Sequence, residues 1–176
     1  MAESIERWLA GPVEDVPSLL QPVAHALIQA SKEIRAMMTD FPEEKLYEKP
    51  AGLASPGFHL KHMRGVLDRL FIYASNNQLS PAQLAYLKSE TEPNGSNAEL
   101  LQALEFQVGD ALKALAETDE ATLTQFRGVG RKQLPSTVIG LLVHAAEHTM
   151  RHTGQLLVTT ALLKYDGQLS TTLFKP

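Results

Sequence analysis

Histidines are the side chains of this sequence whose type and spacing could do chemistry. Five of the six fall in two short windows, and His25 stands alone. The windows are PGFHLKHM, with His59 and His62, and HAAEHTMRH, with His144, His148 and His152. The chain has no cysteine, which excludes disulfides, thiolate zinc sites, iron–sulfur clusters and a cysteine nucleophile. Any bound metal would therefore take its ligands from His, Asp, Glu or water.

The three histidines of the second window are spaced by four residues on a predicted helix. Each step turns the helix by about 40° and rises about 6 Å, so neighbouring members share one face and can bind one ion. His144 and His152 are about 12 Å apart along the axis, too far to share an ion whose bonds to nitrogen are about 2.0–2.1 Å. This helix therefore supplies two ligands, which are His148 together with either His144 or His152. A third ligand would come from His59 or His62.

A second interpretation needs no metal. Helical histidines four residues apart can form a solvated face, or can be buried with hydrogen bonds to neighbouring groups. However, the helix is mostly apolar outside these positions, and burying several unpaired imidazoles is costly. Metal binding would explain their presence there, but the spacing alone leaves both interpretations open.

Four long helical patterns would position the histidines. They cover about residues 16–38, 55–74, 96–117, and from 135 or 136 to 163. Apolar residues recur every three or four positions in the first two patterns, and the fourth is apolar almost throughout. Ser55 followed by Pro56 favours a helix start, and Ser96 with Glu99 has the spacing of a capping box.

The connections between these patterns are polar and rich in turn-forming residues. Between the second and third patterns, SPAQLAYL predicts a short helix capped at Ser80. FRGVGRKQLPS, with two glycines and a proline, predicts a loop or a short hairpin. The tail, residues 165–176, contains STTLF, which could add an extended segment.

Length and composition limit the class of protein. A chain of 176 residues with 44% hydrophobic residues predicts a single domain over 1–176, with a core of roughly 16–163. We expect an all-α fold, a four-helix bundle. The net charge of −4 disfavours nucleic-acid binding. No apolar run approaches the ~20 residues of a membrane span, and the N-terminus does not resemble a signal peptide, so we expect a cytoplasmic protein without membrane contact.

Two motifs resemble one known family. LLVHAAEHTMRHTGQLL resembles the last helix of the DinB-like (DinB/YfiT-like) metal-binding bundles, and SPGFHLKHMRGVLDR resembles their second helix. The order of helices also agrees over roughly residues 16–163. The resemblance implies a four-helix bundle whose metal ligands are one histidine of the second helix and two of the last. The residues of this sequence that match the family's ligand positions in these motifs are His62, His148 and His152. Two departures are Arg151, where many relatives have histidine, and a long segment 77–95.

The resemblance also implies a function. Three imidazoles with open coordination positions are typical of a catalytic site, with zinc or nickel as the expected ion. We expect a metal-dependent enzyme acting on an unidentified small molecule, a hydrolase or a thiol transferase. The alternative is a non-catalytic bundle that binds a metal or a ligand.

Further residues are candidates for supporting roles. His59 could carry a proton near the ion or be a buried histidine bonded to a carbonyl group, and His144 could act similarly. Gln155 and Glu147 could bind the ligands' outer nitrogens or serve only in packing. An unpaired apolar face of such a bundle would favour a homodimer, in which Trp8 could pack at the interface or back onto the bundle.

Overall fold

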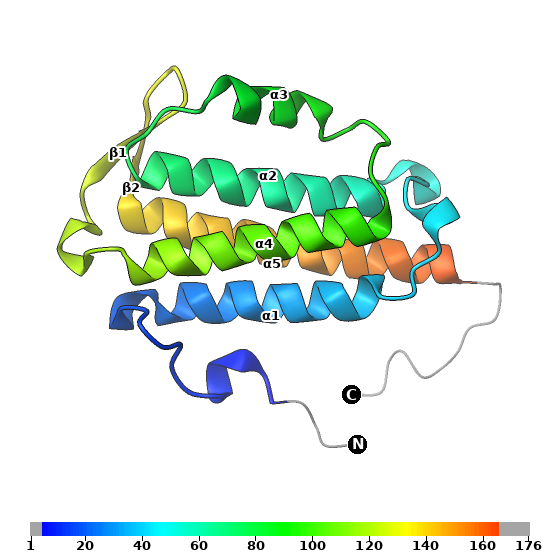
Figure 1. Cartoon of the computed structure of the whole chain (residues 1–176), viewed down its shortest axis with the longest axis horizontal. Coiled ribbons are helices and arrows are strands. Elements are labelled where there is room, and N and C mark those ends of the chain that lie inside the picture. The colour runs from blue at the N-terminus through cyan, green and yellow to red at the C-terminus, as the bar shows by residue number, and fades with distance from the viewer. Residues whose placement is uncertain (1–4, 166–176) are drawn as a thin grey trace.

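Four long helices lie side by side in the computed structural model, which describes residues 5–165 (Figure 1). They are α1 (Gln21–Met38), α2 (Pro56–Ala74), α4 (Asn97–Ala116) and α5 (Val138–Lys164). A short helix, α3 (Pro81–Ser89), runs along the outside of α2. The strands β1 (Phe126–Val129) and β2 (Leu134–Thr137) form an antiparallel hairpin before α5. The fold is therefore mostly helical with a small two-stranded sheet, rather than purely α.

The core lies between the long helices. Helix α5 packs against both α1 and α2, and α4 packs against the same two helices. Large side chains from all four are fully buried, including Leu27, Ile34, Leu60, Leu67, Leu104, Leu115, Leu142 and Leu156. Burial of one such side chain contributes about 1.5–3 kcal/mol. This packing makes α2 and α5 rigid neighbours, which fixes the distance between the two histidine windows.

The helix caps confirm several predicted boundaries. The Ser55 side chain accepts a hydrogen bond from the Phe58 amide at the start of α2. Ser80 and Ser96 each make the expected cap, in both cases as a complete capping box. These side chains satisfy amides that have no partner within the helix, and this is why the sequence predicts such starts well.

Two predicted starts are too early. The first helix does not begin near residue 16, because Ser18–Leu20 form a 3-10 turn and α1 begins at Gln21 with proline in its first turn. The last helix does not begin at residue 135 or 136, because Leu134–Thr137 pair with β1. Helix α5 starts only where the Thr137 side chain accepts a hydrogen bond from the Gly140 amide.

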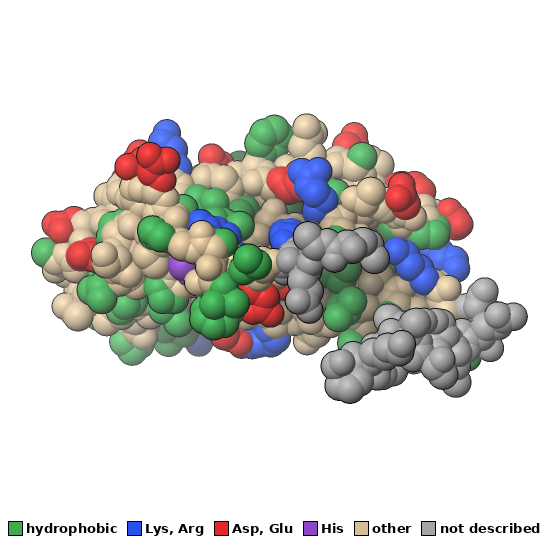
Figure 2. Space-filling view, turned by 90° about the horizontal axis from the view of Figure 1, so that it is seen from below, with side chains coloured by type: hydrophobic (Ala, Val, Ile, Leu, Met, Phe, Trp, Pro, Cys, Tyr) green, Lys and Arg blue, Asp and Glu red, His purple; other side chains and the backbone are tan. Residues whose placement is uncertain are grey.

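The N-terminal segment folds back along α1. The Arg7 amide donates to the Gln29 side chain at 3.0 Å, yet the Trp8 side chain remains 62% exposed. Figure 2 shows this side of the molecule, where hydrophobic side chains are exposed among charged ones.

Two predictions from the sequence are not tested by the structure. The homodimer stays a prediction, and the extended segment predicted in STTLF lies outside the described residues. Within residues 5–165, no helix has the length and apolar character of a membrane span.

Candidate metal centre

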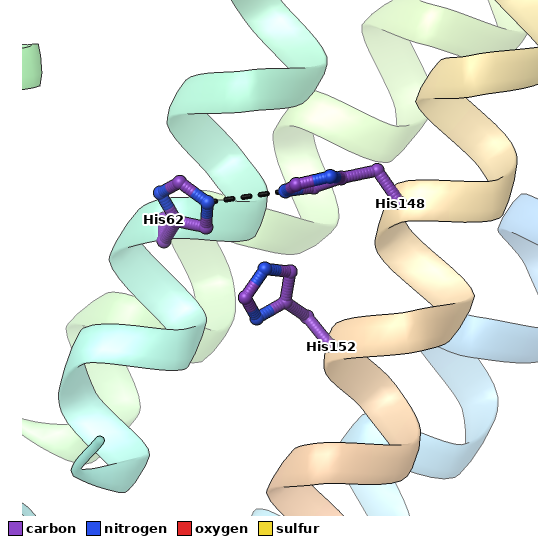
Figure 3. A group of neighbouring side chains, drawn as sticks. All are labelled: His62, His148 and His152. Atoms are coloured by element: carbon purple, nitrogen blue, oxygen red, sulfur yellow. Dashed lines mark hydrogen bonds between the residues drawn. The ribbon is translucent and has the colours of Figure 1, made fainter. Parts of the chain in front are cut away.

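His62, His148 and His152 point toward one another from facing helices (Figure 3). His62 is on α2, and the other two are one turn apart on α5. One ring nitrogen from each lies within 4.8 Å of those of the other two, and His62 Nε2 is 3.1 Å from His148 Nε2. The structure therefore brings together the pair 148/152 and, of the two histidines on α2, His62.

The His62 and His148 nitrogens are close enough to bind one divalent metal ion, and a His152 nitrogen lies within 4.8 Å of both. Two nitrogens that each bind one ion at about 2.0–2.1 Å can be at most about 4.2 Å apart. The 3.1 Å between the Nε2 atoms of His62 and His148 meets that limit. His148 Nδ1 is buried and has no hydrogen-bond partner within residues 5–165, whereas the other nitrogen of this ring, Nε2, faces His62.

Burial keeps the rings in the form that binds metals. The pKa of His152 is lowered to about 3, mainly by burial and in addition by the neighbouring His62 and His148. The pKa of His148 is also lowered, mainly by burial and in addition by His62 and His144. Both rings are therefore neutral at pH 7 in the metal-free protein. A neutral imidazole has the lone pair that a metal ion needs.

The cavity beside this cluster contains His59. It has a volume of about 480 Å³ and is mostly apolar, lined by Leu53, Ala54, Phe58, His59, Arg151, His152, Gly154, Gln155, Val158 and Thr159. His59 is 3% exposed, and its Nδ1 lies 3.0 Å from His152 Nδ1. Phe58 stacks on the His62 ring, with centroids 5.1 Å apart. Of the two catalytic candidates, His59 thus contacts the cluster directly, whereas Gln155 lines the cavity.

Comparison with known proteins gives the family. The family model of the DinB superfamily matches residues 26–156. This chain belongs to the DinB superfamily. Its fold is similar to that of a conserved protein from Enterococcus faecalis, with a TM-score of 0.64 and 20% identity over 83% of this chain and 97% of that one. No curated protein matches the sequence.

The DinB match confirms the resemblance that the two histidine motifs predict. It spans His62, His148 and His152. The fold similarity covers nearly the whole length of the Enterococcus protein, but at this identity it supports the fold alone.

Three further residues of this DinB protein, two on α5 and one on α1, make other contacts. The Glu147 carboxylate accepts hydrogen bonds from Arg151 and is 3.4 Å from His144 Nδ1, with no hydrogen bond to His148 among the described residues. His144 has a 52% exposed side chain. His25 lies on α1, where its Nε2 is 3.2 Å from the Gly11 carbonyl oxygen. Among the described contacts, none of the three residues hydrogen-bonds to a histidine of the cluster.

One residue at the site was missed by the sequence analysis. Glu90 follows α3 and is buried, with its Oε2 2.8 Å from His62 Nδ1 and its Oε1 2.5 Å from Arg69 NH1. It lies 28 residues beyond His62 in the chain. No spacing rule connects two residues across a loop and a short helix. The only available signal was the unusual length of segment 77–95.

The neutral histidines predict a pH dependence of stability in the metal-free protein. The pKa of His59 is lowered to about 4, mainly by burial and in addition by His62. A histidine in the unfolded chain has a pKa near 6.5. Between these values the unfolded chain binds a proton that the folded chain does not, so stability is retained above pH 6.5 and falls as the pH drops toward 4. Urea unfolding of chelator-treated protein from pH 7.5 to 5 should show this loss. His59→Gln should lose less stability over that range, and an unchanged slope would contradict the assignment.

Proposed function

We propose that this DinB protein is a divalent-metal-dependent enzyme acting on a small molecule, as a hydrolase or a thiol transferase. His62, His148 and His152 would be its ligands, with zinc or nickel as the ion. The four long helices would act as the rigid frame of a four-helix bundle. The observation that carries the proposal is the convergence of three imidazoles beside a cavity whose wall includes His152 itself.

The cavity has the properties of a small-molecule site. Its volume of about 480 Å³ is within the range of ligand pockets, about 300–1,000 Å³, and its lining is mostly apolar with a few polar groups. Leu53, Phe58 and Val158 would hold the apolar part of a substrate and exclude water. Arg151 and Gln155, from successive turns of α5, would orient its polar part.

A three-imidazole site with open positions supplies Lewis acidity to a bound oxygen or sulfur atom. The protein's own contribution would be proton transfer and positioning. His59 lies in the cavity wall, and its neutral ring has one nitrogen that can accept a proton and one that can donate a proton. Its contact with His152 would link that proton to the ligand cluster. His59 is therefore our candidate for the acid–base residue.

The test uses two chemically different probes. Protein purified without a histidine tag would be stripped, reloaded with zinc or nickel, and assayed for hydrolysis of p-nitrophenyl acetate and for displacement of chloride from 1-chloro-2,4-dinitrobenzene by a thiol. We expect turnover of at least one probe that chelation removes and reloading restores. His59→Gln should lower the rate while metal content is unchanged. A loaded protein with no turnover of either probe would contradict this proposal and favour a non-catalytic metal-binding role.

A further inference from the structure

The segment between α2 and α4 carries a buried carboxylate into the histidine cluster. Glu90 is 3% exposed, and its two oxygens have different partners. Oε2 lies 2.8 Å from His62 Nδ1, and Oε1 accepts a hydrogen bond from Arg69 at 2.5 Å. An ionised carboxylate only accepts hydrogen bonds, so beside an ionised Glu90 the shared proton would be on His62 Nδ1. His62 Nε2 then has a free lone pair, and this is the atom that faces His148.

Helix α2 presents a matching surface to Glu90. Lys61, Gly65 and Arg69 are spaced by four residues, so they line one side of the helix. Gly65 provides the room, because a Cβ atom there would lie 2.1 Å from Glu90 Oε1 and 2.6 Å from Arg69 NH1. Any larger residue at position 65 would push the carboxylate away from its two partners.

Lys61 holds the backbone on both sides of Glu90. Its ammonium group is buried and donates to the carbonyl oxygens of Ser89, at 2.6 Å, and Glu92, at 2.8 Å, and to the Asn94 side chain at 2.5 Å. These three contacts satisfy all three donors of a lysine. The peptide that carries Glu90 is thus fixed to the helix that carries His62.

We propose that Glu90 is a positioning residue that holds His62 in the Nδ1–H tautomer, with the Nε2 lone pair directed at the metal position. The inference rests on the proposed metal function and adds a residue on which that site depends. A carboxylate on the outer nitrogen both orients a ligating imidazole and makes it a stronger ligand. Arg69 pairs with the buried carboxylate, since an unpaired charge would be costly there. The long segment 77–95 would therefore serve to complete the metal site.

A purely structural role makes different predictions. If the Arg69–Glu90 pair served only to attach α3 to α2, losing the carboxylate would lower stability without changing the His62 tautomer or the affinity for zinc. The tautomer of a histidine can be read from its 15N chemical shifts and couplings. It can be read in metal-free protein, so it does not depend on the proposed function.

The experiment compares wild type, Glu90→Gln and Glu147→Gln. Glu147 is the matched control, because it is adjacent to His148 in sequence but bonded to Arg151. In metal-free wild type at pH 8 we expect the Nδ1–H tautomer at His62, and in Glu90→Gln a loss of that preference. Competition with a chromophoric chelator should show zinc affinity lowered about 10–100-fold in Glu90→Gln and unchanged in Glu147→Gln.

Two results from the wild type and Glu90→Gln would overturn the inference. One is an Nε2–H tautomer at His62 in the wild type. The other is a folded Glu90→Gln variant that binds zinc as tightly as the wild type. If Glu90→Gln does not fold, Gly65→Ala, which displaces the carboxylate without removing it, must reproduce the loss of affinity, and an unchanged affinity overturns the inference. A wild type that binds no zinc but has the Nδ1–H tautomer would refute the proposed function and leave the Glu90–His62 contact intact.

Discussion

Replacing His148 with alanine will weaken zinc binding by more than about 100-fold, because loss of an outer partner alone typically costs about 10–100-fold and this change removes a ligand itself. His148 is central to the cluster, with its Nε2 3.1 Å from His62 and its ring centroid 4.6 Å from that of His152. Two imidazoles would remain, too few for a site of three protein ligands. Chelator competition and metal-to-protein ratios would measure the effect.

His144→Ala is the matched control for this prediction. It removes the same ring from the same helix, one turn away, where the side chain is 52% exposed. We expect full zinc binding in His144→Ala and loss in His62→Ala and His152→Ala. Circular dichroism would establish that each variant is folded. If His148→Ala keeps tight stoichiometric zinc while His144→Ala loses it, the ligand pair on α5 would be 144/148, and our assignment would be wrong.

The distinction between these pairs shows what the sequence can predict and what it cannot. The spacing of four identifies which histidines share a face of α5, because helix geometry is local. It does not identify which pair faces His62, because that depends on how α2 and α5 are rotated about their axes. Motif resemblance selected 148/152, and the structure places these two rings next to His62.

Local signals also explain the accuracy of the element boundaries. Helices α2, α3 and α4 begin where serine caps predict, because a cap involves only residues within one turn. The start of α5 was predicted too early because Leu134–Thr137 pair with a strand several residues upstream. Glu90 could not be predicted for the same reason. Its partners, His62 and Arg69, are brought to it by the tertiary path of segment 77–95 rather than by any periodicity.

Replacing Arg69 with methionine should lower the free energy of unfolding by about 3–5 kcal/mol, the usual cost of removing one partner from a buried ion pair. Glu90 has a 4% exposed side chain and Arg69 an 11% exposed one, so little water can replace the guanidinium. The loss comes from a buried carboxylate left without its cation. It follows that Arg69→Met combined with Glu90→Gln should recover much of the stability, since the uncompensated charge is then gone.

The surface pair Arg151–Glu147 is the control for this prediction. Its side chains are 51% and 47% exposed, and an exposed ion pair is worth at most about 1 kcal/mol. Urea unfolding of the metal-free variants Arg69→Met, Arg151→Met and Arg69→Met combined with Glu90→Gln would give the comparison. A cost for Arg69→Met no greater than that for Arg151→Met would mean that the Glu90 carboxylate does not depend on Arg69. A large cost for Arg69→Met would show that the buried Glu90 carboxylate beside His62 depends on Arg69 as its charge partner.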